Sequence, residues 1–262
     1  MRIRFQKHTV IGRNPWLDEA YVKHCEQLVG GVEVEFASLP EGVYSGPVPA
    51  DLVKYGQLEV LFSWYFADQA RAAERSGCEA YIIGTSQDPG LAMARSLVSI
   101  PVVGYGSTTF GFLHGQGLRF GVIGFIRELE EVLRSNMRAE GWMSSCVGFE
   151  YLPEGRALVE STIASGDPSG LLAAMAPLAA RLKASGAQVL VSGEGLENEV
   201  LWAHGVRDVA GLKVIDSNGL ALMTAVMHAQ AVKLGVWASG DDGYFTRRAD
   251  PEEVERIRGV LF

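Results

Sequence analysis

The chain has few cysteines, no excess of positive charge and no long apolar run. Three cysteines in 262 residues are too few for a disulfide framework, which indicates a reducing compartment. No stretch approaches the ~20 apolar residues of a membrane-spanning helix. The first residues also lack the apolar core of a signal peptide. We therefore expect a cytoplasmic protein that is not attached to a membrane.

The charge balance and the scattered histidines exclude further classes of protein. Lys and Arg number 23 against 31 Asp and Glu, giving a formal net charge of −8. A nucleic-acid binder or a polybasic membrane anchor would need a basic surface, so neither partner is expected. No His pairs with a Cys or a carboxylate at metal-ligand spacing, and no phosphate-binding glycine motif follows the first predicted strand. We expect neither a metal nor a cofactor.

The residues that are present predict an α/β protein. Short apolar runs alternate with longer amphipathic segments, a pattern typical of βαβ units around parallel sheets. Strands are predicted over Arg2–Phe5, Val32–Phe36, Ala80–Gly84, Pro101–Val103, Arg119–Ile123, Cys146–Tyr151, Gln188–Val191 and Lys213–Ile215. Helices are predicted over Pro15–Val29, Leu58–Ser76, Pro89–Leu97, Arg127–Glu140, Pro168–Ser185 and Leu220–Leu234, the last of these buried, and a final helix starts at Asp250.

An internal echo divides the chain into two similar halves. Ala80–Ser86 and Val189–Gly195 each read as a buried strand running into a polar loop, and each follows a helix ending in Ser-Gly. Similar halves predict a pseudo-twofold arrangement, and ligands bind at the carboxyl ends of parallel strands. We therefore expect one pocket between the lobes, with the loops at Thr85 and Glu194 facing each other across it.

Two segments carry a family resemblance. Ile82–Gly104 contains Asp-Pro-Gly-Leu followed by Ile-Pro-Val-Val-Gly, and Ser192–Leu196 reads Ser-Gly-Glu-Gly-Leu. Both resemble the aspartate/glutamate/hydantoin racemase superfamily, especially its hydantoin and allantoin racemase branch. The resemblance covers about residues 1–234. It implies a flavodoxin-like fold of two parallel-sheet lobes, a small-molecule substrate and a homo-oligomer. We expect residues 1–113 with 217–262 to form one lobe, and 114–216 to form the other.

The catalytic cysteines of that superfamily are absent at the matching positions. The first falls on Thr85 and the second on Gly193, whereas Cys25, Cys78 and Cys146 lie outside the predicted site loops and are expected to be small buried side chains. Racemisation without a cofactor needs two opposed acid/base groups, and neither threonine nor glycine replaces a thiolate. The resemblance thus implies a member that works without catalytic thiols.

Glu194 is the main candidate for the missing base. It sits at a strand end between two glycines, and burial would raise the pKa of its carboxyl toward neutrality. Gly193 would let the backbone approach a ligand. Thr85, Ser86 and Gln87 follow the equivalent strand of the other half and are candidates to bind substrate; Thr85 is also a candidate nucleophile. Helix capping by Glu194 and ordinary turn chemistry at Thr85 and Ser86 are the alternatives.

Other polar residues are weaker candidates. Ser107 and Thr108 stand in a predicted loop that, in the superfamily, helps to hold substrate, with an ordinary turn as the alternative. His8 follows the first strand and is a candidate donor or acid/base group, unless it is an exposed loop residue. Asp88 is predicted to cap the Pro89–Leu97 helix.

Three residues that follow Glu194 are predicted to lie outside the site. His204 is expected to be structural or solvated near the end of the helix that begins after Glu194. Glu197 and Glu199 are expected to face solvent in the first turn of that helix.

Three functions follow from these residues. The first is a thiol-free isomerase or lyase acting on a small carboxylate or hydantoin-like amide. The second is a hydrolase of an amide or cyclic amide in which Glu194 activates water or Thr85. The third is a small-molecule binding protein that retains the pocket without catalysis.

Overall fold

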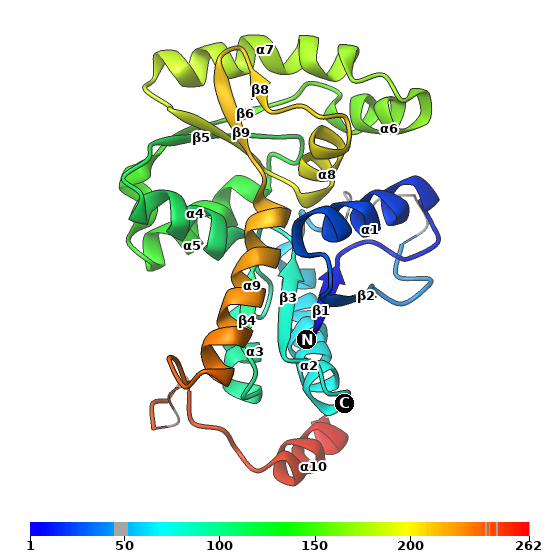
Figure 1. Cartoon of the computed structure of the whole chain (residues 1–262), viewed down its shortest axis with the longest axis vertical. Helices are drawn as coiled ribbons and strands as arrows, with labels where there is room; N and C mark the ends of the chain where they lie inside the picture. The colour runs from blue at the N-terminus through cyan, green and yellow to red at the C-terminus, as the bar shows by residue number, and fades with distance from the viewer. Residues whose placement is uncertain (45–51, 239, 241, 245, 262) are drawn as a thin grey trace.

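The protein consists of two lobes, each built on its own parallel sheet (Figure 1). The computed structural model describes residues 1–44, 52–238, 240, 242–244 and 246–261. The first sheet has the order β2-β1-β3-β4, with every pair parallel. Its strands and the helices that alternate with them are β1 (Arg2–Lys7), α1 (Pro15–Val29), β2 (Glu33–Ala37), α2 (Gly56–Arg75), β3 (Ala80–Gly84), α3 (Leu91–Leu97), β4 (Val102–Gly104) and α4 (Tyr105–Gly115).

The second sheet repeats this order. Its strands run β6-β5-β7-β9-β8, and only the short β8 pairs antiparallel, with β9. The elements are β5 (Phe120–Gly124), α5 (Leu129–Ala139), the 3₁₀ turn η1 (Trp142–Ser145), β6 (Cys146–Tyr151), α6 (Gly155–Ser165), α7 (Ser169–Ala184), β7 (Val189–Ser192), α8 (Gly195–Ala203), β8 (Asp208–Val209) and β9 (Leu212–Ile215). The predicted α/β class is confirmed, and β3 and β7 hold equivalent places in the two sheets.

The central strands β3 and β5 are apolar throughout, as expected for strands of a sheet that helices cover on both faces. All five residues of β3 and of β5 are buried. The edge strands β2 and β6 are only partly buried, and charged residues such as Glu33 and Glu150 occur in them. The central strands thus hold the two strand-end loops in fixed positions.

Helix α9 (Ser217–Lys233) follows the second sheet in the chain but packs on the first sheet. Ala221, Leu222 and Ala225 share one core with Ile3 and Ile82. Figure 1 shows α9 running beside β3 and β4 away from the second lobe. The prediction that this helix is buried holds for one face only, since Met223 and Met227 on the other face are 54% and 56% exposed.

The C-terminal segment folds back onto the first lobe. Helix α10 (Pro251–Leu261) contacts α2 through an ion pair of 2.8 Å between Glu255 and Arg71 and another of 3.5 Å between Arg258 and Asp68. Phe262 lies outside the described residues.

Two helices, α4 and α6, are missing from the prediction. Residues 105–115 resemble a loop because glycine and hydroxyl residues are frequent and charged residues are absent, yet they form α4 directly after β4. The carboxylate of Asp88 accepts from the Gly106 and Ser107 N–H groups, at 3.0 and 2.5 Å, and so caps this helix from a distant loop. Asp88 therefore does not cap α3, which follows Gly90 in a left-handed conformation.

Within the part of the chain that the structure describes, no helix is both long enough and apolar enough to cross a membrane.

Candidate active site

A pocket lies between the two lobes, at the carboxyl ends of β1, β3, β5 and β7. The volume of this cavity is about 60 Å³. Its lining comes from both lobes and comprises Lys7, His8, Thr9, Tyr21, Val53, Gly84, Thr85, Ser86, Gln87, Phe125, Ile126, Leu129, Glu194, Gly195 and Leu196. Among these residues Glu194 is the only carboxyl group and Lys7 the only permanent cation.

Glu194 is buried and held by backbone N–H groups. Its Oε1 accepts from the Ile126 N–H at 3.0 Å, and the Phe125 N–H lies within 3.2 Å of both oxygens. A methyl group on Gly124 would lie only 3.0 Å from Oε1, so glycine makes room for the carboxyl. The side chain does not cap α8. Burial raises the pKa of Glu194 to about 8, although the two backbone donors partly oppose the shift.

Glu197 and Glu199 are both fully buried, so the prediction that they face solvent is wrong. The reason is that α8 starts between the lobes, where its first turn is covered on every side. Glu197 has no hydrogen-bond partner for either oxygen among the described residues. Burial, and to a smaller extent the nearby Glu194 carboxyl, raises the pKa of Glu197 well above its usual range.

The opposite wall carries hydroxyl and amide groups. Thr85 Oγ1 donates to Gln87 Oε1 at 2.7 Å, and both side chains are buried. The Ser86 hydroxyl makes no hydrogen bond to any described residue, which leaves it available to a ligand. The Asn136 side chain donates to the Gln87 carbonyl at 2.9 Å and fixes this loop to α5. These groups can stabilise charge on a substrate oxygen.

The end of β1 forms a third wall. The Lys7 ammonium pairs with Asp18 and lies 5.2 Å from the centre of the Tyr21 ring. His8 is buried against the edges of Phe62 and Phe66, so the alternative of an exposed loop residue is wrong. Burial lowers the pKa of His8 to about 4, which keeps its ring neutral at pH 7.

Three predicted substrate-binding residues are not part of this pocket lining. Gly193 lies behind it, where its N–H donates to Ile123 O at 2.6 Å and its Cα faces the backbone of Gly124. Ser107 and Thr108 lie in the first turns of α4. Ser107 lines a separate cavity between the helices of the first lobe and α5. The predicted loop at Ser107 and Thr108 is a helix, and this difference moves both hydroxyls away from the pocket.

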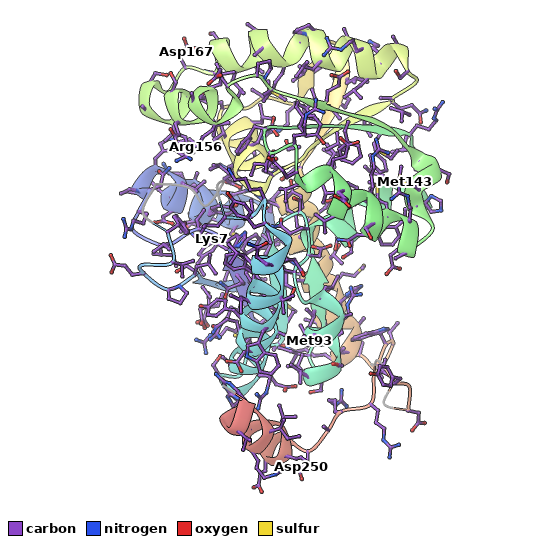
Figure 2. The ribbon with its side chains drawn as sticks, turned by 180° about the vertical axis from the view of Figure 1, so that it is seen from behind. Lys7, Met93, Met143, Arg156, Asp167 and Asp250 are labelled. Atoms are coloured by element: carbon purple, nitrogen blue, oxygen red, sulfur yellow. The ribbon has the colours of Figure 1, made fainter. Side chains whose placement is uncertain are left out.

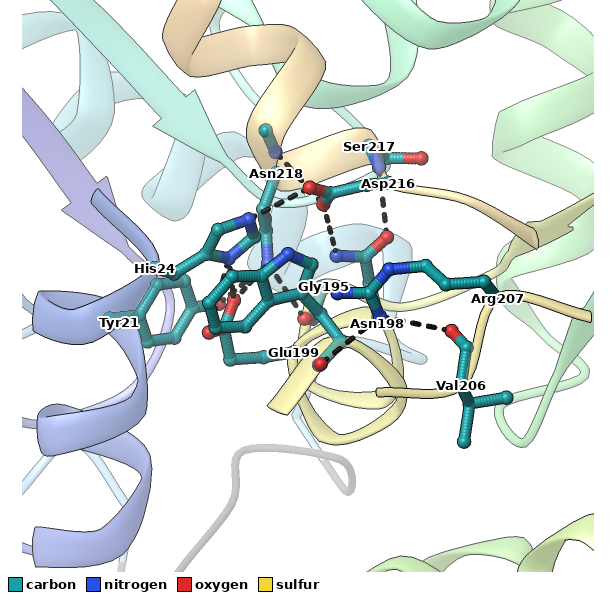
Figure 3. Close-up of polar contacts among 12 residues, drawn as sticks. Tyr21, His24, Gly195, Asn198, Glu199, Val206, Arg207, Asp216, Ser217 and Asn218 are labelled. Carbon is teal, nitrogen blue, oxygen red and sulfur yellow. Dashed lines mark hydrogen bonds and ion pairs between the residues drawn. The ribbon is translucent and has the colours of Figure 1, made fainter. Parts of the chain in front are cut away.

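A buried ionic network joins the two lobes beside the pocket (Figure 3). His24 in α1 bonds Glu199 at 2.9 Å through Nδ1 and Asp216 at 2.8 Å through Nε2. Burial alone would lower the pKa of His24, but hydrogen bonds and charge attraction from Asp216 and Glu199 raise it to about 9. Asn218 donates to Glu199 and to the Gly195 carbonyl, so the network reaches the pocket wall.

The remaining histidine candidate is structural. His204 stacks on Trp16 with ring centres 5.6 Å apart and bonds the Val200 carbonyl, in agreement with the prediction that it lies outside the site. Among the described residues no group of three His, Cys, Asp or Glu side chains is arranged to hold a metal ion.

None of the three cysteines lines the pocket. Cys25 and Cys78 are buried, and Cys146 is half-buried in an edge strand. Burial raises the pKa of Cys25 to about 12 and also raises that of Cys146. We expect iodoacetamide at neutral pH to leave activity within about twofold, because no thiol lines the pocket, Cys78 is buried, and the raised pKa values of Cys25 and Cys146 disfavour the reactive thiolate. Loss of activity that substrate prevents, with one alkylated cysteine found by mass spectrometry, would contradict this placement.

Some of the pocket has no signal in the sequence. The Phe125 and Ile126 N–H groups that hold Glu194 are backbone atoms, so residue type does not reveal them. Lys7 and Thr9 could have been found, because they follow the first strand and strand ends of parallel sheets meet at one edge.

Comparison with known proteins supports one family. The profile of the Asp/Glu/hydantoin racemase family matches residues 19–225. No curated protein sequence matches the chain.

Solved structures resemble the chain over nearly its whole length. The allantoin racemase from Klebsiella pneumoniae has a TM-score of 0.72 at 21% identity, covering 95% of this chain and 94% of its own. The allantoin racemase from Pseudomonas fluorescens has a TM-score of 0.70 at 16% identity, covering 96% and 98%. A mutant of arylmalonate decarboxylase in a sulfate-associated form has a TM-score of 0.59 at 16% identity, covering 93% and 97%. At such identities the likeness establishes the fold alone.

Proposed function

The chain belongs to the Asp/Glu/hydantoin racemase family, and from this premise we propose that it is a cofactor-independent isomerase or lyase that transfers a proton without a catalytic thiol. Its substrate is a small carboxylate or amide bound between the lobes. The carrying observation is the position of Glu194, a buried carboxyl with a pKa near 8 that lines the inter-lobe pocket together with Thr85 and Ser86.

Glu194 is suited to give and take a proton at neutral pH. Below pH 8 most of the carboxyl is protonated and serves as a general acid; the ionised fraction serves as a general base. An enolate formed at the substrate would be stabilised by the free Ser86 hydroxyl and by the Gln87 amide. Thr85 holds Gln87 in place for this task.

The pocket favours transfer on one face of the substrate. His8 is neutral and only weakly basic, and no second carboxyl lines the pocket among the described residues. A racemase needs an acid/base group on each side of the carbon, whereas an isomerase or lyase that protonates one face needs one. Hydrolysis through Thr85 is less well supported, because the Thr85 hydroxyl donates to Gln87 and not to Glu194.

Hydrogen exchange in D₂O tests this proposal. The protein is incubated with small substituted malonates, 2-substituted acids and hydantoins, and products are followed by NMR. We expect one deuterium at the carbon next to a carbonyl, on one face only, in the substrate that is turned over. The Glu194→Gln variant should lose this incorporation.

The control is Glu128→Gln, a nearby exposed carboxyl outside the pocket, which should exchange like the unchanged protein. Binding of these compounds without exchange or product would instead identify a binding protein.

A further inference from the structure

The carboxyl end of β1 presents three consecutive polar residues to the pocket: Lys7, His8 and Thr9. Lys7 is almost completely buried, with 2% of its side chain exposed. An ammonium group has three donors. The only hydrogen bond that the Lys7 ammonium makes to a described residue goes to Asp18, so donors remain for a ligand. Figure 2 shows Lys7 at the level where the two lobes meet.

The side chains of the next two residues, His8 and Thr9, also have polar atoms without hydrogen-bond partners. His8 Nε2 and Thr9 Oγ1 are both buried and have no hydrogen-bond partner among the described residues. Buried polar atoms without partners are rare in folded proteins because their desolvation is not compensated. Three adjacent residues of the pocket lining with unused polar capacity therefore indicate a place where a ligand supplies the partners.

The charges define the kind of ligand. Among the described residues of the pocket lining Lys7 is the only lysine or arginine, and Glu194 is mostly protonated at pH 7. An anion entering the pocket thus meets a buried ammonium and, on the part of the lining that the structure describes, no full negative charge. A neutral cyclic ureide would leave that ammonium without a charged partner from the ligand.

We propose that Lys7 binds a carboxylate of the substrate, with His8 and Thr9 completing the subsite, so that this pocket selects small organic anions over neutral cyclic ureides such as hydantoin. The inference rests on the proposed function in taking the inter-lobe pocket as the substrate site. On this inference the ligand of this chain is an organic anion and differs from allantoin, which the racemases of similar fold are named for. Asp18 is the internal counter-ion that holds the ammonium ready.

Calorimetric titration with malonate and with hydantoin tests the subsite. We expect the unchanged protein to bind malonate more tightly than hydantoin. Lys7→Met should weaken malonate binding by about 10- to 100-fold, as for the loss of a hydrogen bond to a charged group, and should not weaken hydantoin binding. Asp18→Asn, which keeps the acceptor for the Gly12 N–H, should strengthen malonate binding because the ammonium loses its competing partner.

The opposite signs of these two variants distinguish recognition from a structural role, in which both would weaken binding. Lys23→Met is the matched control, since Lys23 lies on α1 with 62% of its side chain exposed and should bind malonate normally. Hydantoin binding as tight as malonate binding, or weakening in both Lys7→Met and Asp18→Asn, would overturn the inference.

Different experimental outcomes would overturn the inference and the proposed function. Exchange on a neutral substrate that Lys7→Met leaves unchanged would overturn the inference and keep the function. Malonate binding that depends on Lys7, without exchange on any acid, would keep the inference and overturn the function.

Discussion

Replacing Glu194 by glutamine is expected to reduce turnover by about 100-fold or more, the usual effect of losing a general acid/base group. Glutamine keeps the size of the side chain, and its carbonyl oxygen can still accept from the Phe125 and Ile126 N–H groups. Substrate binding should therefore persist. The dependence of the rate on pH should lose the limb that reflects a pKa of about 8.

The same variant should be more stable than the unchanged protein at high pH. The pKa of Glu194 is higher in the folded state than in the unfolded chain, so ionisation between about pH 4.5 and 8 lowers the free energy of unfolding. Glutamine removes this loss, and urea unfolding should show the gain at pH 9 but not at pH 4. Normal turnover in Glu194→Gln would rule out the proposed mechanism.

Replacing His24 by phenylalanine is expected to lower the free energy of unfolding by about 3–5 kcal/mol, as for a buried ion pair that loses one partner. Phenylalanine can still stack on Trp202, whose ring centre lies 3.7 Å from that of His24. It leaves Glu199 buried and Asp216 mostly buried without their cation. Urea unfolding at pH 7 measures the effect.

The dependence on pH identifies the cause. The pKa of His24 is about 9 in the folded protein, above its ordinary value of 6.5. Its contribution to stability is thus complete below pH 6.5 and is lost as the pH rises through 9. His24→Phe should flatten the stability curve over that range. His228→Phe, a histidine that also stacks on a tryptophan, should have little effect. Equal losses in both variants would show that packing and not charge is responsible.

The sequence predicts the sheets well because buried parallel strands are short, continuous apolar runs. The similarity of Ala80–Ser86 and Val189–Gly195 also predicts that Thr85 and Glu194 share one pocket, and both line it. These predictions depend on local pattern and on the rule that strand ends gather at one edge.

Other features depend on contacts between distant segments. Helix α4 is capped by Asp88 and covered by α9, neither of which is evident from residues 105–115. Glu197 looks like a solvent-facing residue in the first turn of a helix, but the first lobe covers that turn. A prediction from charge and local sequence therefore places Glu197 in solvent, because the local sequence does not show which residues another lobe will bury.

The return of α9 to the first sheet has a consequence for synthesis on the ribosome. The chain emerges from its N-terminus, so β1 to β4 leave the exit tunnel long before Ser217–Lys233. Until then Ile3, Ile82 and Val103 lack the helix that completes their core. The core of the first lobe therefore stays exposed, and accessible to chaperones, while the whole second sheet is translated. The second sheet is thus complete before the first lobe is, although the strands of the first lobe are made earlier.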